Sequence, residues 1–239
     1  MPPDRRTQSF RDWSVSGLTK ISYISSPFIA TFLLIHLSAP TMACLGGPSL
    51  SSQTMILGRE YYQTPFGEKY LVLGPIAVHA LSGLFKRLLS KKSPRPARSL
   101  LSMTGYSIMI LFLPIHFFTH RLHPTSPLDP IHSVGPAELD FEFVKLGLQK
   151  WPFVSWGLYV GLLLSIGLHL ADGANIIWNS RLKESLGRPR RWRIQSLAML
   201  AFPPLIGLWF LANEPSLVLS STARRFEAAF RENWLYRIL

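Results

Sequence analysis

Five of the seven histidines in this sequence lie in stretches that contain no charged residue. An imidazole in an apolar helix is costly unless it has a partner, and its neutral nitrogen is a good axial ligand for haem iron. His36, His79, His116 and His169 are therefore candidate cofactor-binding and metal-ligating residues. His120, one helical turn after His116, is an alternative ligand at the edge of the same stretch.

The four histidines fall at two depths if each stretch is a helix that rises 1.5 Å per residue. Measured from the basic residues that flank the stretches, His36 and His116 lie roughly 24–27 Å away, and His79 and His169 roughly 10–18 Å. Two levels with two imidazoles each would suit bis-histidine ligation of haem b. Hydrogen bonding between helices without a cofactor, and a proton or quinone site, remain open as alternatives.

The histidines also belong to a repeated pattern. Phe-Leu-Leu-Ile-His ends at His36, and Phe-Leu-Pro-Ile-His ends at His116, 80 residues later. His-Ala-Leu-Ser-Gly ends at Gly83, and His-Leu-Ala-Asp-Gly ends at Gly173, 90 residues later. Two matches in the same order predict a duplicated helical hairpin. Each glycine would leave room beside a histidine for a flat macrocycle.

Five long apolar stretches position these histidines. A helix needs roughly 20 apolar residues to cross about 30 Å of hydrocarbon, and 48% of this chain is hydrophobic while only 16% is charged. We predict an all-α integral membrane protein: a four-helix bundle from the duplicated hairpin, a fifth helix and a C-terminal amphipathic helix. A polar tail, 1–17, precedes a membrane domain, 18–212, with spans at about 18–42, 70–89, 99–120, 151–179 and 194–212.

Basic residues lie mainly on one side of these spans. The N-terminus and the loops 90–98 and 180–193 share a near side with sixteen Lys and Arg residues and three acids, whereas the far side has nine of each. Such a bias is the positive-inside pattern, so the near side is predicted to be cytosolic. The net charge of +12 thus reflects membrane topology rather than nucleic-acid binding, because no soluble basic domain with interspersed aromatic residues accompanies it.

The far-side segments are predicted to be loops at residues 43–69 and 121–150. In the C-terminal segment, residues 213–239, Phe226 and Phe230 begin an apolar pattern at helical spacing, which predicts an amphipathic helix. Two placements of this helix are open: on the membrane surface, or folded back against the ends of the spans.

Other kinds of chemistry are poorly represented. Cys44 is the only cysteine, so the chain has no internal disulfide and no cysteine-based metal cluster. No nucleophile–base pair, phosphate loop or carboxylate pair falls in a plausible shared site, so we expect no catalysis. Asp172, the only acid inside a predicted span, is expected either to bond to Asn175 or a neighbouring helix, or to face a polar cavity.

Three motifs carry a resemblance to a known family. They are Gly-Arg-Glu-Tyr-Tyr-Gln from Gly58, Pro-x-x-x-His-x-x-Ser-Gly from Pro75, and His-x-x-Asp-Gly from His169. Over about residues 18–212 the chain resembles the fungal mitochondrial outer-membrane adaptors known as the Mdm-ten-complementing proteins. It is more distantly similar to the di-haem cytochrome b anchors of succinate dehydrogenase and fumarate reductase, which share five spans with histidines in the first four.

The first resemblance implies a multi-pass protein of the mitochondrial outer membrane with a cytosolic N-terminus. Such adaptors recruit a bridge-like lipid-transfer protein of the vacuolar protein sorting class, and so support lipid homeostasis at organelle contact sites. They do so through a Pro-x-Pro motif in a longer N-terminal tail, whereas here the tail is short. The near-side Pro-x-Pro motif of this chain is Pro94-Arg-Pro96, whose prolines are the candidate partner-binding residues or merely break the loop.

The second resemblance implies a different function. It predicts a di-haem cytochrome b-type membrane anchor that transfers electrons to a quinone, with the four histidines as haem ligands.

Overall fold

The computed structural model describes residues 5–90, 96, 98–182 and 192–238. Within these residues the regular secondary structure is entirely helical, and five helices are long and apolar enough to cross a membrane. The prediction of an all-α integral membrane protein with five spanning helices is confirmed. The chain divides into two compact units, residues 1–36 with 57–99 and residues 37–56 with 100–239.

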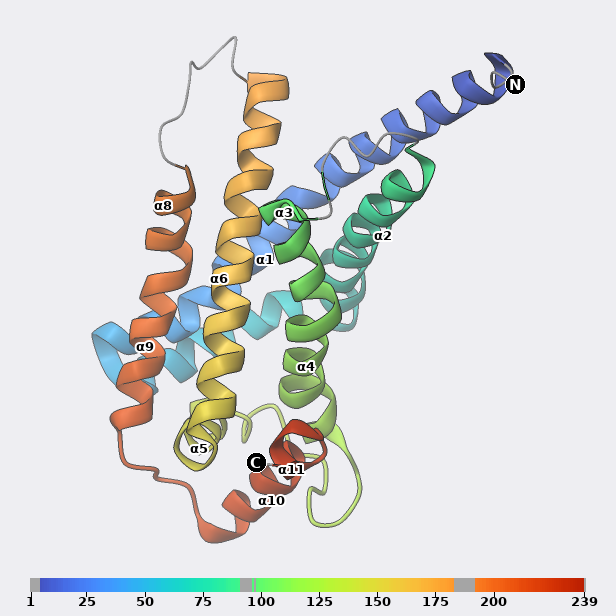
Figure 1. The fold of residues 1–239 in the computed structure, drawn as a ribbon. Coiled ribbons are helices and arrows are strands. Elements are labelled where there is room, and N and C mark those ends of the chain that lie inside the picture. The colour runs from blue at the N-terminus through green and yellow to red at the C-terminus, as the bar shows by residue number, and fades with distance from the viewer. Residues whose placement is uncertain (1–4, 91–95, 97, 183–191, 239) are drawn as a thin grey trace. The chain divides into compact units, whose positions relative to one another are not determined.

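The first helix is much longer than the sequence predicts. Helix α1 runs from Arg5 to Tyr62, so it begins inside the predicted polar tail, and it is kinked at Gly46 and Gly47 (Figure 1). Gly47 has a φ of 59°, in the left-handed region that favours glycine. The kink therefore depends on a residue without a side chain.

Beyond the kink, the chain runs back beside the turns that precede it. In the second unit the Ser51 hydroxyl donates to the Ala39 carbonyl at 2.7 Å. In the first unit a Cβ on Gly58 would lie 3.1 Å from the Ile35 side chain, so these two helical segments are in close contact. Much of the predicted far loop, residues 43–69, is therefore helical, because its apolar residues pack against the helix before it.

The first unit is completed by α2, Gly74–Leu89, which continues a π-helical segment, Gly67–Leu73. In the second unit, α6 (Pro152–Ile177) lies between two composite helices. One contains α3 (Leu100–Tyr106) and α4 (Leu113–Phe117), and the other contains α8 (Trp192–Ser196) and α9 (Phe202–Asn213) (Figure 1).

Four π-helical segments share one local cause. They end two residues before Pro75, Pro114, Pro124 and Pro203. A proline inside a helix lacks an N–H donor, and its ring clashes with the carbonyl four residues earlier. Widening the preceding turn to the π form moves this carbonyl away, so the helical path continues past Pro75, Pro114 and Pro203. After Pro124 it ends with the 3₁₀ turn His123–Thr125.

A cap of short helices lies at one end of the second unit. It comprises α5 (Phe141–Lys150), α10 (Ser220–Arg231) and α11 (Leu235–Ile238) (Figure 1). The rings of Phe143 and Phe230 stack with centroids 4.3 Å apart. Of the two predicted placements of the C-terminal helix, the structure has the one that folds back, because this aromatic face is buried against α5.

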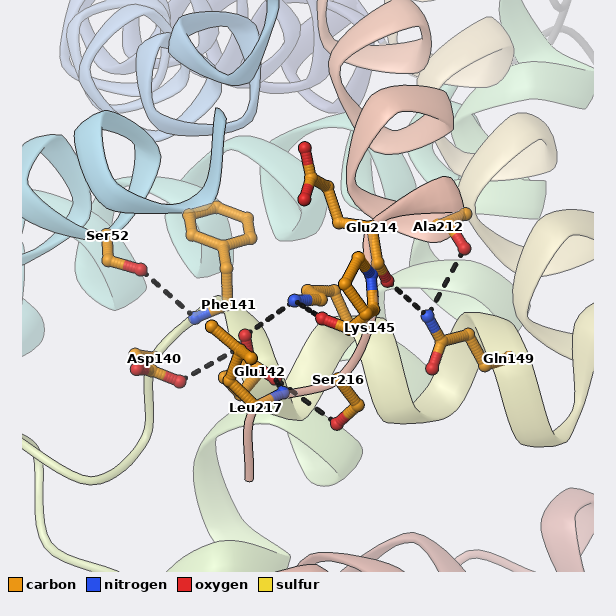
Figure 2. Close-up of polar contacts among 11 residues, drawn as sticks. Ser52, Asp140, Phe141, Glu142, Lys145, Gln149, Ala212, Glu214, Ser216 and Leu217 are labelled. Atoms are coloured by element: carbon orange, nitrogen blue, oxygen red, sulfur yellow. Dashed lines mark hydrogen bonds and ion pairs between the residues drawn. The ribbon is translucent and has the colours of Figure 1, made fainter. Parts of the chain in front are cut away.

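Polar contacts hold the cap to the end of α9. Lys145 is completely buried and pairs with Glu142, with 2.6 Å between Nζ and Oε1 (Figure 2). Its ammonium also donates to the Pro215 carbonyl at 2.8 Å. The Gln149 amide donates to the carbonyls of Ala212 and Glu214 at 3.3 and 2.8 Å (Figure 2). The predicted loop 121–150 thus contains a helix that orders the segment after α9.

Candidate functional site

In the first unit, His79 joins α2 to α1. Its Nδ1 lies 3.2 Å from the Ser22 carbonyl oxygen and 3.2 Å from the Ser25 hydroxyl. A carbonyl oxygen only accepts, so the proton is on Nδ1 and Nε2 is the unprotonated nitrogen. This contact satisfies a polar side chain that would otherwise be costly between apolar helices.

In the second unit, His169 joins α6 to α3 in the same way. Its Nδ1 lies 3.1 Å from the Leu101 carbonyl oxygen and 3.5 Å from the Thr104 hydroxyl. Each imidazole thus contacts a carbonyl and, three residues later on the same helix, a hydroxyl. Because this geometry recurs in both units, it supports the prediction of a duplicated hairpin.

The spacing of the repeat has a structural explanation. Ser22 and Ser25 precede Leu101 and Thr104 by 79 residues, but His36 precedes His116 by 80. A π-helical segment, Ser107–Phe112, lies between these positions in the second unit. Because a π turn accommodates one extra residue, it absorbs the insertion without ending the helix.

His36, the second histidine of the first unit, lies among aromatic rings. Its ring stacks on Phe32 with centroids 5.2 Å apart and meets Tyr62 edge-on at 5.6 Å. The Gly-Arg-Glu-Tyr-Tyr-Gln motif therefore lies at the end of α1, in the part of the helix that returns beside its earlier turns and covers His36. This role is not predicted from the sequence, although the pair of tyrosines in the predicted loop is a signal of it.

The second unit brings three polar side chains together around a small cavity. The rings of His116 and His120 lie 4.6 Å apart with a 38° tilt. The Tyr159 hydroxyl is 3.1 Å from His120 Nε2. All three line a cavity that has space for about one water molecule. Tyr159 was not among the predicted site residues, and only the packing of α6 against α4 reveals its role.

The C-terminal segment closes this cavity. Tyr236 is part of its lining. The Asn233 amide donates to the Thr119 hydroxyl at 3.0 Å, and both residues are buried. The cavity is therefore covered by residues distant in sequence from the helices that form it.

The predicted haem ligands do not form a haem pocket within either unit. A haem macrocycle is much larger than the water-sized cavity beside His116 and does not fit there. Beside His36 the space is filled by aromatic rings. The predicted pairs, His36 with His116 and His79 with His169, each take one histidine from each unit. Haem ligation by these pairs stays a prediction.

Asp172 has its partner on a neighbouring helix, as one of the two predicted alternatives requires. Its carboxylate accepts two hydrogen bonds from Arg193, at 2.8 Å from Nε and 3.2 Å from Nη2. The pair joins α6 to α8. Of the candidate partner-binding prolines, Pro96 is exposed, and Pro94 lies outside the described residues.

The helices and their polar contacts define a multi-pass α-helical membrane protein. Residues 111–223, slightly less than half of the chain, match the family model described as MDM10-complementing protein 1, transmembrane domain. This part of the chain is thus similar to that domain. No curated protein and no solved structure matches the chain, so the similarity to cytochrome b anchors gains no support.

Proposed function

We propose that the chain is a non-enzymatic adaptor of the mitochondrial outer membrane, which recruits a bridge-like lipid-transfer protein of the vacuolar protein sorting class to organelle contact sites. One observation carries the proposal: the match of residues 111–223 to the transmembrane domain of MDM10-complementing protein 1. This match covers α4, α5, α6, α8 and α9, which belong to the second unit, and it ends in the first turn of α10.

The charge distribution supports a cytosolic near side. Short loops rich in Lys and Arg remain on the cytosolic side of a membrane, and they attract anionic headgroups with about 1 kcal/mol per basic residue. Arg193, next to the start of the fifth predicted span, pairs with Asp172 and so joins α8 to α6. In this orientation the cap lies on the opposite side, away from the proposed partner.

Two near-side segments are available for recruitment. Pro96 is exposed in the linker between α2 and α3. At the start of α1, Phe10 and Trp13 are 67% and 73% exposed, with ring centroids 6.2 Å apart. Exposed aromatic residues and proline are both suited to protein docking, although Phe10 and Trp13 also suit the membrane interface.

Recruitment is tested by copurifying the lipid-transfer protein with tagged chain from mitochondria, after Pro94→Ala/Pro96→Ala and after Phe10→Ala/Trp13→Ala. Pro127→Ala, an exposed far-side proline, is the matched control. We expect one near-side variant to lose most of the partner while the control retains it. Protease treatment of intact mitochondria should remove an N-terminal tag. Recovery of the partner with both near-side variants, or a protected tag, would contradict the proposal.

A further inference from the structure

The cavity of the second unit collects nitrogen and oxygen donors in apolar surroundings. His116 and His120 come from successive turns of one helix, and Tyr159 from α6. We propose that His116, His120 and Tyr159 bind one divalent transition-metal ion of borderline softness, such as zinc or copper(II). This inference does not depend on the proposed adaptor function.

Two histidines four residues apart on a helix commonly supply two ligands to one metal ion. Their ring centroids are 4.6 Å apart, and both imidazoles line the cavity. Imidazole nitrogen suits zinc, copper, iron and nickel, so the ligands favour this class over calcium or magnesium.

The separation of Tyr159 from His120 also fits shared coordination. Zinc binds nitrogen and oxygen ligands at about 2.0–2.2 Å, so two ligands of a tetrahedral ion lie about 3.3 Å apart. The Tyr159 hydroxyl and His120 Nε2 are 3.1 Å apart. A metal ion can therefore replace the hydrogen bond between them with little movement of either ring.

The cavity has space for about one water molecule, which is enough for one small ion. The described residues contain no group of three or more His, Cys, Asp and Glu side chains suited to a metal ion. In the proposed site Tyr159 supplies the third ligand. Its phenolic proton leaves to solvent when the oxygen binds the cation, which reduces the buried charge from two to one.

The cap controls access to this site. Tyr236 lines the cavity, and Asn233 holds Thr119 in its wall. An ion that enters or leaves from the far side must displace this segment. Metal exchange should therefore be slow while the cap is folded, and loosening the cap should accelerate it.

The test uses the full chain in lipid nanodiscs, titrated with cobalt(II) as a visible probe and then with competing zinc. We expect one cobalt per chain, a d–d absorption band, and release of one proton. His120→Gln and Tyr159→Phe should weaken binding by about 100-fold or more, because each removes a direct ligand. Tyr70→Phe, at an exposed tyrosine of the first unit that is outside the cavity, should bind cobalt as the unchanged protein does.

A second measurement separates lost ligation from lost folding. Zinc should raise the melting temperature of the unchanged protein and of Tyr70→Phe, but not of His120→Gln or Tyr159→Phe, since only binding to the folded state stabilises it. The proposal is overturned if the unchanged protein shows neither a cobalt band nor a zinc-dependent shift. It is equally overturned if both effects survive the two ligand substitutions, or if the purified protein holds haem through His116.

Discussion

The two units contain the same histidine contact but differ around their second histidine. His79 and His169 each bond to a main-chain carbonyl and a nearby hydroxyl. The other two histidines have different surroundings. His36 lies among the aromatic rings of Phe32 and Tyr62. His116 lies beside His120, Tyr159 and a small cavity. The first pair joins helices within each unit, and the second pair is where the two units differ.

A main-chain acceptor explains why one contact recurs. Ser22 and Leu101 have unlike side chains, but their carbonyl oxygens are equivalent acceptors. The hydroxyl partners, Ser25 and Thr104, are chemically alike. A contact of this kind tolerates substitution at one of its two partner positions, so it can persist while surrounding side chains change.

The cap distinguishes the second unit most strongly, and its buried ion pair should give the largest effect. Lys145→Ala leaves Glu142 without its cation in a site where both side chains are mostly buried, so we expect a loss of about 3 kcal/mol of unfolding free energy. Lys150→Ala is the matched control, because its pair with Glu227 is more exposed and should contribute less than about 1 kcal/mol. Amide exchange should rise in α10 and not in α2. Similar losses of unfolding free energy in Lys145→Ala and Lys150→Ala would contradict a larger contribution from the buried pair.

Close helix packing should give the next largest effect. A Cβ at Gly207 would lie 1.8 Å from the Pro40 carbonyl oxygen, whereas those at Gly83 and Gly173 would meet nothing within 4 Å. We expect Gly207→Ala to destabilise the second unit by about 1–3 kcal/mol. Gly83→Ala and Gly173→Ala should be neutral or stabilise by up to about 1 kcal/mol. Thermal unfolding measures all three, and a neutral Gly207→Ala would refute the close approach.

The recurring histidine contact makes a matched pair of variants possible. His79→Ala and His169→Ala should each cost about 1 kcal/mol, the usual contribution of a polar contact between membrane helices. Ser25→Ala and Thr104→Ala keep the carbonyl contact and should cost less. Unequal losses would show that the two contacts are not equivalent. A Soret band in the unchanged protein that either histidine variant abolishes would instead support the haem prediction.

Lowering the pH should give the smallest change in stability. Arg225, hydrogen-bonded to Glu138, lowers the pKa of Glu138 below its usual 4.5. A lowered carboxyl pKa stabilises the fold above the unfolded pKa, and this contribution is lost as pH falls through the folded pKa. Burial raises the pKa of Asp140, whose contribution has the opposite sign.

The effect of Arg225 is isolated by comparison with Arg225→Gln. Proteolysis of the C-terminal segment should be slower in the unchanged protein near neutral pH, by a factor that corresponds to a few tenths of a kcal/mol for an exposed pair. The difference should shrink as the pH falls below the ordinary glutamate pKa and vanish once Glu138 is protonated in the folded protein. A difference that persists after this protonation would exclude this ion pair as its cause.

The spans, their order and the duplicated hairpin could be predicted from the sequence alone. Charge-free stretches of sufficient length identify helices in lipid, since every backbone group must be satisfied within the segment. Pro114 is visible in the sequence, but the π-helical turn before it is not. Only the backbone geometry shows that this turn accommodates the extra residue that shifts the repeat. The bounds of the loops were harder, because residues 48–62 and 141–150 become helical through apolar contacts with other segments.

Only the tertiary structure decided which groups meet. Sequence spacing placed His116 and His120 on one helix face but could not indicate Tyr159, which arrives from α6. Nor could it choose Arg193 as the partner of Asp172, or place Phe230 against Phe143. Whether a segment is apolar enough to lie in lipid depends on that segment alone, so the spans follow from local composition. Side-chain partners depend on how segments distant along the chain pack together, which local composition does not contain.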